Sequence, residues 1–599
     1  MIQSMTKYSF VLLSGDKEKF LENLGSLGLV DIVRAAKPID EKSAEMLAEA
    51  EKLRKAIATL EALPSGDAAS GKFSEPKADD VFERVSKIAV EKLNIEELDK
   101  EAEMVVHWGR FDLDKIARLR EQGCTIRFYA VQKKRFSPSW ADEAALTVIS
   151  ETKDKVYFVT ASDSEEYSFP AEPCAAPERT LAQIEEEKQK ALGRIAGHEA
   201  RLQQLKNLLP ELRSKYEALL IELDRYLADS TAQPAAEEAL CVYTGFAPSE
   251  NDASLKEAFD KMPVYYIQEK AIVEDKPPIA LKNNKFTRMF TVLTDMYGRP
   301  EYNGFDPTPY ISVFFMLFFA FCMGDAGYGI LLTLIGIAMG RTASTKSLAP
   351  LVTTLGVATV VIGFLFHTFF SIDIAGWKIF EPISGIFLPA KIGDYDGTMV
   401  LALIVGVVHI CLALVVKTVY ATKNNGLLGS LGVWGWTLLI VGGVIVGAFS
   451  LFGVLGAEAT KWTIIVLGIL SALGIFLLND IHRNPLINIG AGLWETYNTA
   501  TGLLGDVLSY LRLYALGLAG AMLGFAFNDL GLQILGDGAI LNWVFFILVV
   551  VIGHTLNLAM CALGAFVHPL RLNFLEFFKN SAYEGNGRIY SPLKNNINK

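Results

Sequence analysis

Residues 505–519 read GDVLSYLRLYALGLA, in which Arg512 has apolar sequence on both sides for more than a helical turn. They belong to a long, largely apolar run that extends over 486–527. An arginine at the centre of a membrane helix costs about 2.5–3.5 kcal/mol on insertion scales, so it tends to face a partner or water. The run therefore predicts a membrane helix that carries a functional charge.

Further apolar runs surround this one from Tyr310 onward, and each is bounded by short polar loops. The first two share one run, which we divide at Gly324 and Asp325 because three glycines and an acid make a poor mid-membrane helix. A single kinked helix is the alternative. We expect eight membrane helices, near residues 309–324, 326–340, 348–370, 399–421, 428–454, 461–479, 486–527 and 539–578.

The last two predicted helices are long for a membrane. Each has about 40 residues, or about 60 Å of helix, which is twice a hydrocarbon core of about 30 Å. Tilt, partial emergence into the cytoplasm or a break would accommodate the excess. We favour tilt, because polar residues recur along both helices rather than gathering at one end.

The first 300 residues differ in composition, since they are rich in Glu, Lys, Asp and Arg. The fold class we expect is an α-helical polytopic membrane domain (301–599) fused to an N-terminal α/β cytoplasmic domain (1–300). The hydrophobic content of 51% over 599 residues belongs mainly to the membrane part. The cytoplasmic part should contain an α/β lobe (1–36 plus 240–275), two stalk helices (about 40–63 and 180–227) and a second lobe (about 78–175), with strands at 124–131 and 155–161.

Charge and cysteine usage limit the function classes. A net charge of -11, without a dense basic tract, argues against nucleic acid as a partner. Six scattered cysteines indicate neither a disulfide framework nor a zinc site, and no cofactor is implied. The N-terminus has too short an apolar stretch for a signal peptide. Loop charges favour a multi-pass protein of the cell membrane with both termini in the cytoplasm; the basic residues on that side are Arg341, Lys346, Lys417, Lys423, Arg483, Lys579, Arg588, Lys594 and Lys599.

Two stripes of small and polar residues mark the last two helices. The residues of each stripe follow one another at alternating spacings of three and four, which place them on one helix face. The first stripe ends at Arg512 and the second at Arg571. On position alone, an anchor near the cytoplasmic end is the alternative for Arg571. The stripes are Glu495, Asn498, Gly502, Gly505, Ser509, Arg512 and His554, Asn557, Cys561, Gly564, His568, Arg571.

The stretches GDVLSYLRLYALGLA (505–519) and ALGAFVHPLRLNFLEFF (562–578) closely resemble the C-terminal signatures of subunit a, or subunit I, of vacuolar-type and archaeal-type rotary ATPases. Residues 276–283, 297–300, 306–309 and 324–329 also resemble this family. The likeness spans roughly 275–580, and the first 275 residues agree only in architecture.

The resemblance implies a non-catalytic stator subunit whose Arg512 and Arg571 face a ring of proteolipid subunits. Each ring carboxylate would ionise beside them, and the ion would cross by two offset half-channels. His568 could hydrogen-bond Arg571 or relay protons. Glu495 and Asn498 could line an outer half-channel or simply begin a helix at the interface. The candidate ion-path residues are Arg512, Arg571, His568, Glu495, Asn498, Ser509 and Asn557.

The resemblance further implies, as partners, the proteolipid c-ring, peripheral-stalk subunits of the E/G type, a central-stalk adaptor subunit and membrane lipids. Two positions depart from the eukaryotic pattern: Cys561 replaces a glutamate and Gly520 replaces a histidine. Half-channel roles cannot be carried over to them. Asp325, His367 and His409 are further polar candidates in the membrane part. The choice between protons and sodium ions depends on the ring, which supplies the ion-binding carboxylate.

One motif in the soluble half needs separate mention. Residues 66–72 match most of a phosphate-binding loop, but Phe73 stands where Ser or Thr would hold magnesium. We therefore expect ATP to be handled by other subunits. Two other function classes remain, a secondary transporter and a membrane tether with a coiled-coil stalk. The transporter would usually show internal repeats, which residues 310–578 lack, and the tether would not need intramembrane arginines.

Overall fold

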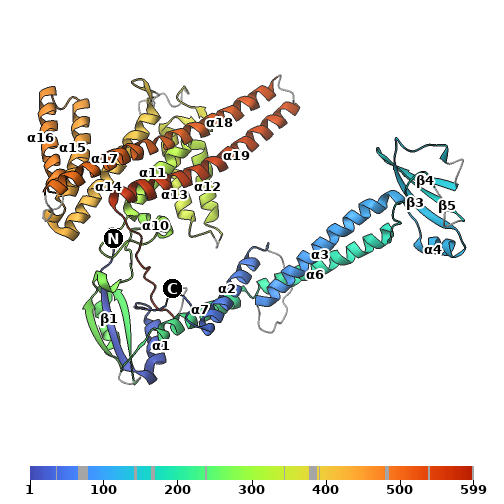
Figure 1. Cartoon of the computed structure of the whole chain (residues 1–599), viewed down its shortest axis with the longest axis horizontal. Helices are drawn as coiled ribbons and strands as arrows, with labels where there is room; N and C mark the ends of the chain where they lie inside the picture. The colour runs from blue at the N-terminus through green and yellow to red at the C-terminus, as the bar shows by residue number, and fades with distance from the viewer. Residues whose placement is uncertain are drawn as a thin grey trace. The chain divides into compact units, whose positions relative to one another are not determined.

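The computed structural model describes residues 1–35, 37–64, 78–140, 145–163, 169–235, 239–342, 345–376, 387–389, 391–478, 485–536 and 540–595 (Figure 1). The chain divides into two compact units. Unit 1 comprises Met1–Leu12, Leu29–Ile32 and Val242–Pro592, and unit 2 comprises Leu13–Gly28, Val33–Cys241 and Leu593–Lys599. The phosphate-loop-like segment at 66–72 lies outside the described residues.

Long helices dominate unit 2, in two packed pairs (Figure 1). Helix α2 (Glu41–Glu61) packs against α7 (Leu209–Ser230), and α3 (Ala78–Val105) packs against α6 (Leu181–Lys206). Their shared core includes Leu53, Leu60, Val81, Leu202 and Leu212. Both α2 and α6 begin at the capping boxes that their sequences encode, Asp40 with Ser43 and Thr180 with Gln183.

Two details of unit 2 differ from the sequence prediction. The segment 180–227 is two helices, because Pro210 lies in the first turn of α7 and proline cannot donate the backbone hydrogen bond of a helix interior. Residues 78–105, which we expected in the second lobe, form a helix of 28 residues instead. The four helices therefore replace the two stalk helices that the composition suggested.

A small antiparallel sheet completes unit 2. Its strands are β3 (Thr125–Gln132), β4 (Ala145–Glu151) and β5 (Lys155–Ser162), in the order β3-β5-β4, and α4 (Leu113–Glu121) precedes them. The two strands that the sequence predicted are β3 and β5. The pattern missed β4, whose side chains are mostly exposed and lack a buried face. Tyr129, Val156 and Phe158 form the core of this sheet.

A second sheet has the order β2-β7-β1-β8 and combines strands from both ends of the soluble half. Its strands are β1 (Met5–Leu13), β2 (Asp31–Ile32), β7 (Leu240–Pro248) and β8 (Tyr265–Lys270), with β6 (Gln233–Ala235) beside β7. Strands β1 and β8 pair antiparallel from Thr6 with Lys270 to Val11 with Tyr265. In unit 1, Tyr8 and Phe10 pack on Phe259 at the end of α8 (Asp252–Phe259). The two parts of the lobe predicted from residues 1–36 and 240–275 thus share one sheet.

The chain beyond the last apolar helix returns to this sheet. Ile589 pairs with Ile279, and Gly587 pairs with Arg299. The Asp31 carboxylate of β2, which is 2% exposed, accepts the Ser591 backbone N–H at 3.1 Å and lies 3.4 Å from an Arg588 nitrogen. We call residues 587–591 the C-terminal strap.

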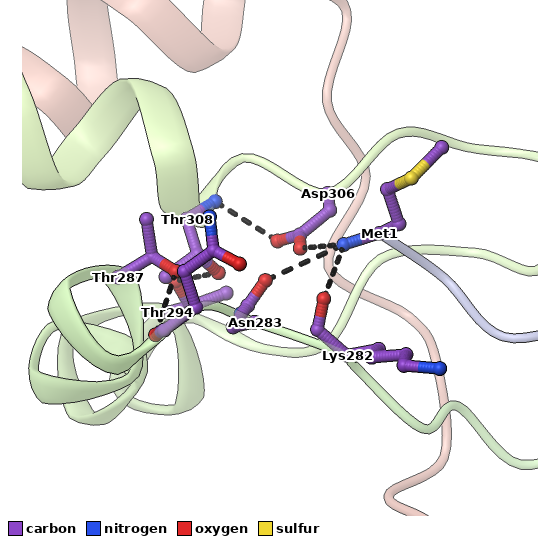
Figure 2. A network of polar contacts seen from close by, with 8 residues as sticks. Met1, Lys282, Asn283, Thr287, Thr294, Asp306 and Thr308 are labelled. Atoms are coloured by element: carbon purple, nitrogen blue, oxygen red, sulfur yellow. Dashed lines mark hydrogen bonds and ion pairs between the residues drawn. The ribbon is translucent and has the colours of Figure 1, made fainter.

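Polar contacts order the segment before the first apolar helix (Figure 2). The buried Asp306 carboxylate lies 2.7 Å from the amino group of Met1 and accepts the Thr308 backbone N–H at 3.0 Å. Thr308 is the first residue of α11 (Thr308–Met323), and its hydroxyl lies 3.0 Å from the Thr294 hydroxyl. The Asp306 carboxylate therefore accepts a hydrogen bond from a backbone N–H at the start of α11 and also forms an ion pair with the amino group of Met1.

Within the described residues, five helical runs are long and apolar enough to cross a membrane: Gly397–Gly429, Leu431–Leu451, Ala457–Phe476, Leu486–Leu535 and Ile540–Ser581. Three shorter apolar helices precede them, α11, α12 (Ala326–Met339) and α13 (Ala349–Leu365). The first three long runs are α14, α15 and α16, the fourth contains α17 (Pro485–Ser509) and α18 (Leu511–Leu535), and the fifth begins with α19 (Ile540–Arg571). The chain is a membrane protein.

The predicted division of the first apolar run is confirmed. Helix α11 ends at Met323, and Gly324 follows in a left-handed conformation with φ of +55°. Asp325 then caps α12, because its side chain accepts the backbone N–H groups of Gly327 and Tyr328. The alternative of one kinked helix is wrong.

The last two runs are each interrupted, and a break was one of the three ways of accommodating their length that the sequence left open. At Tyr510 the backbone N–H bonds to Val507 three residues back, and Leu513 bonds to Tyr510 in the same tight pattern. The final run contains a π-helical turn, Leu572–Phe577, and then α20 (Phe578–Ser581). Pro569, which has no N–H to donate, lies just before that turn.

Candidate functional site

Both predicted arginines lie beside an interruption of their helix. Arg512 is the second residue of α18, directly after the tight turn at Tyr510, and Arg571 is the last residue of α19 before the π turn. Arg571 is exposed, whereas Arg512 is partly buried. One nitrogen of Arg512, Nη1, is buried with no hydrogen-bond partner among the described residues. Arg512 therefore carries a buried donor for which the described residues supply no acceptor.

His568 links the two arginines electrostatically. It lies one turn before Arg571 on α19, and the charges of both Arg512 and Arg571 act on its imidazole. Its Nδ1 is buried and has no hydrogen-bond partner among the described residues. The structure therefore brings together three of the residues that the two stripes predicted.

Glu495 and Asn498 lie elsewhere, in a cavity of about 270 Å³ that Lys417, Asp506 and Lys579 also line. Lys579 and Asp506 form an ion pair there, with Nζ 3.1 Å from each carboxylate oxygen. Lys417 and Lys579 are among the residues that the loop-charge rule assigns to the cytoplasmic side. The outer half-channel expected for Glu495 and Asn498 and the cytoplasmic side expected for Lys417 and Lys579 thus concern one and the same cavity.

Asn557 belongs to a buried hydrogen-bond network between α12, α18 and α19. Its side-chain N–H groups donate to the Tyr328 hydroxyl at 2.8 Å and to the Gly520 carbonyl at 2.9 Å. The Tyr328 hydroxyl lies 2.7 Å from Nδ1 of His554, whose Nε2 lies 2.8 Å from Oδ1 of Asn528. Two members of the second stripe, His554 and Asn557, are thus joined through Tyr328, and Asn528 extends the network beyond His554.

The two positions that depart from the eukaryotic pattern face each other. A Cβ atom at Gly520 would lie 2.6 Å from the sulfur of Cys561. The Cys561 thiol donates to Oδ1 of Asn557 at 3.3 Å. A small residue at 520 is therefore required by its neighbour at 561, so the two departures form one local arrangement.

Asp325 and His367 have contacts within the chain that account for them. Besides the two caps of α12, the Asp325 carboxylate accepts the backbone N–H groups of Phe370 at 2.9 Å and Ser371 at 2.6 Å. His367 lies 2.9 Å from the Asp373 carboxylate. Among the residues that the structure describes, no cluster of His, Cys, Asp or Glu could hold a metal ion.

Sequence reasoning missed Glu576, a carboxylate in the π turn. Glu576 is 4% exposed, and its Oε2 has no hydrogen-bond partner among the described residues. The hydroxyl of Ser509 and the charge of Arg512 act on it. Five residues of α-helix would place Glu576 about 140° from Arg571, so the α-helical stripe excluded it. The π turn changes that phase, and no sequence signal announced the turn.

Comparisons with known proteins agree with these features. The sequence model of the V-type ATPase 116kDa subunit family matches residues 149–372 and 498–595, just over half of the chain. These ranges contain every predicted ion-path residue except Glu495. Three similar proteins are each named subunit I of an A-type or V-type ATP synthase. The A-type ATP synthase subunit I of Methanocaldococcus jannaschii is 29% identical over 75% of this chain and 67% of its own length.

Two other relatives differ in how much they cover. The V-type ATP synthase subunit I of Borreliella burgdorferi is 25% identical over 99% of both chains. The A-type ATP synthase subunit I of Pyrococcus horikoshii is 32% identical over 53% of this chain and 48% of its own. Similarity at full length therefore extends across the soluble half as well as the apolar helices.

Proposed function

Because the chain belongs to the V-type ATPase 116kDa subunit family, we propose that it is the ion-conducting stator subunit of a rotary ATPase. The single observation that carries the proposal is the grouping of Arg512, His568 and Arg571 next to interruptions of the last two helical runs. In this role Arg512 and Arg571 face a ring of proteolipid subunits. The three short and five long apolar runs form eight membrane passes.

Arg512 supplies the electrostatic step. A guanidinium in a region of low dielectric constant attracts an approaching carboxylate and favours its ionised form, so a ring carboxylate loses its ion there. The Arg512 side chain is only partly buried, so the guanidinium can offer a donor for that contact. A charge-assisted hydrogen bond is about twice as strong as a neutral one, and it must be broken again when the ring advances. Arg571 and His568 add positive charge and a proton-exchanging group beside it.

The ion reaches the arginines from the cytoplasm along α17. The cavity lined by Glu495, Asn498 and Asp506 supplies water and carboxylates at the cytoplasmic end. Ser509 and the buried Glu576 continue this path to Arg512. The Ser509 hydroxyl interacts with the Glu576 carboxylate, and the charge of Arg512 acts on the same carboxylate. This assignment replaces the outer position first expected for Glu495 and Asn498. Its support is the ion pair between Asp506 and Lys579 at the same end.

The second half-channel runs along α19 on the opposite side of the arginines. Asn557, Tyr328 and His554 provide a continuous series of exchangeable protons, with successive polar atoms 2.7–2.8 Å apart. Asn528 extends it at 2.8 Å from His554. Because the inner and outer paths meet only at the ring, an ion crosses the membrane only when the ring turns.

The remaining assignments concern topology and partners. Eight passes place both termini in the cytoplasm, as the basic loops predict. Residues 301–599 form the membrane domain, and residues 1–300 form the cytoplasmic domain. The latter attaches to peripheral-stalk subunits of the E/G type and to a central-stalk adaptor subunit, and the former contacts the proteolipid c-ring and membrane lipids. The four packed helices of unit 2 give the cytoplasmic domain a form suited to resisting torque.

The decisive experiment uses the whole complex in sealed vesicles and the variants Arg512→Ala and Arg512→Lys. ATP-driven ion uptake should fall by at least tenfold in both, because Lys keeps the charge but not the planar fork of donors. Assembly of the complex should persist. Arg341→Ala, in a polar loop after α12, is the matched control and should transport normally. Normal uptake by Arg512→Ala would overturn the proposal.

A further inference from the structure

His409 occupies an enclosed aromatic site within α14. It is 0% exposed, and its ring lies between those of Phe314, at 4.2 Å and 29°, and Phe577, at 4.8 Å and 8°. Phe318 contacts it edge-on at 5.1 Å. Its Nδ1 lies 2.9 Å from the hydroxyl of Tyr510. A buried imidazole held by stacking and one hydrogen bond has a fixed orientation.

The partners of His409 belong to the two segments that carry the arginines. Tyr510 separates α17 from α18 and precedes Arg512 by two residues, and it is also 0% exposed. Phe577 is the last residue of the π turn that begins directly after Arg571. One side chain from a third helix therefore contacts both interruptions.

The surface of α14 is shaped to receive Tyr510. Gly406, one turn before His409, faces the tyrosine ring so closely that a Cβ atom there would lie 2.4 Å from its Cγ. Glycine at 406 and the imidazole at 409 thus form a socket for the phenol. The tight turn at Tyr510 sets the direction in which Arg512 leaves the helix, because a three-residue hydrogen bond winds the backbone further per residue than an α-helical one.

We propose that His409 is a positioning residue that holds Arg512 and Arg571 in register with each other by anchoring Tyr510 and Phe577 to α14. The inference rests on the proposed function, since register matters only if both arginines meet the same ring. Each passing carboxylate pulls on Arg512, and the hydrogen bond to Tyr510 transmits that pull to α14. Without it, Arg512 samples more orientations, and carboxylates pass without exchanging their ion in the correct half-channel.

Two single variants isolate the hydrogen bond from the packing. His409→Phe keeps a ring between Phe314 and Phe577 but removes the nitrogen, and Tyr510→Phe keeps the phenyl ring in the socket but removes the hydroxyl. The readout is ATP-driven ion uptake divided by ATP hydrolysis, measured on the same vesicles holding the whole complex. We expect each variant to lower this ratio about three- to tenfold, as the loss of one buried hydrogen bond would. A merely structural role would lower uptake and hydrolysis together and leave the ratio unchanged.

The double variant supplies a second test. Because both single variants remove the same bond, His409→Phe with Tyr510→Phe should be no worse than either alone. Thr418→Val is the matched control, since it removes another buried hydrogen bond from α14, that between Thr418 and Thr437. It should leave the ratio at the wild-type value. Additive losses in the double variant, or an equal loss in Thr418→Val, would overturn the inference.

The result also separates this inference from the function on which it rests. If Arg512→Ala abolishes uptake while His409→Phe and Tyr510→Phe keep the wild-type ratio, only the positioning role of His409 is wrong. If Arg512→Ala keeps normal uptake, the stator function itself is wrong. His409→Gln provides a rescue arm, because its side-chain amide can again bond to the Tyr510 hydroxyl. We expect Gln to restore part of the ratio that Phe loses.

Discussion

Asp325 shows how a single carboxylate organises strained backbone inside the membrane part. It accepts four backbone N–H groups, two in the first turn of α12 and two from Phe370 and Ser371. Phe370 and Ser371 have φ angles of +48° and +58°, which residues other than glycine rarely adopt. The four donors offset that strain, which gives Asp325 a structural role in this loop.

Replacing Asp325 by Asn should therefore weaken the complex before it alters transport. Gly327, Tyr328 and Phe370 donate to one carboxylate oxygen and Ser371 to the other, so the amide would deprive the Ser371 N–H of its acceptor and weaken three charge-assisted bonds, at a cost of about 2–5 kcal/mol. Thermal inactivation of the purified complex measures the loss. Asp373→Asn, whose carboxylate is 68% exposed, serves as the control and should change little. Equal stability of Asp325→Asn and wild type would contradict this role.

At the same scale, the sequence indicated part of the proposed ion path for a clear reason. Helical spacing selected Arg512, His568 and Asn557, because all three lie within α-helices. It missed Glu576, since the π turn changes the phase of the helix after Arg571. It left open whether Glu495 lines an outer half-channel or begins a helix at the interface, because periodicity gives the face of a helix but not the end of the membrane to which that face leads.

Among the elements, α12 and α13 make the closest helix pair. Glycines on each helix meet backbone of the other: Gly329 faces Val360, Gly356 faces Thr333, and Gly363 faces Ala326. Without water between membrane helices, close packing of small residues replaces the hydrophobic effect as the attraction. The sequence predicted both helices, yet the pairing of these glycines needed the three-dimensional positions.

The variant Gly363→Leu tests this packing. A Cβ atom at residue 363 would lie 2.2 Å from the backbone nitrogen of Ala326, and backbone cannot move aside as a flexible side chain can. We expect destabilisation of at least about 3 kcal/mol and a several-fold lower yield of assembled complex. The control is Gly443→Leu on α15, where a Cβ atom meets nothing within 4 Å. A normal yield from Gly363→Leu would show that the two helices can separate without loss.

The start of α2 should respond to acid. Hydrogen bonds from the hydroxyl groups of Ser43 and Tyr226 and from the Ser43 backbone lower the pKa of Asp40 to about 2. A carboxyl group whose pKa is lowered by folding stabilises the folded form above its unfolded pKa of about 3.9. That contribution is lost as the pH falls from about 4 to about 2.

Asp40→Asn should thus be less stable than wild type at pH 7, and the difference should shrink as the pH approaches 3. Limited proteolysis of the full-length protein between Asp40 and Glu61 reports the opening of α2. Glu45→Gln, an exposed carboxylate on the same helix, is the control and should show no such pH-dependent difference. A difference that grows on acidification would contradict the assigned direction of the pKa shift.

For the whole molecule, the proposed stator role requires that the soluble half be held still while the ring turns. Sheet β3-β5-β4, at the end of the α3–α6 pair, presents exposed side chains such as Val148, which is 40% exposed. A stalk subunit that binds to this sheet would hold the far end of the α3–α6 helix pair. The sequence predicted two of these strands and the helices near them, but not how four helices pair, because pairing depends on which apolar faces meet.

A photo-crosslinking residue at Val148 should therefore capture a peripheral-stalk subunit in the assembled complex. The matched position is Leu451, at the end of α15, which is 89% exposed and belongs to the membrane part. It should capture lipid or detergent instead. Mass spectrometry of the adducts identifies both. Capture of the same stalk subunit from both positions, or from neither, would remove the attachment from this lobe.

The C-terminal strap imposes an order on biosynthesis. Asp31 emerges early from the ribosome, whereas its partners Arg588 and Ser591 are translated only after every membrane helix. Until then the Arg588 charge and the Ser591 N–H are missing from the surroundings of a carboxylate that is 2% exposed in the finished sheet, and both contacts stabilise a buried charge. We therefore expect strand β2 to be held less firmly in a chain that has not yet been translated to residue 591.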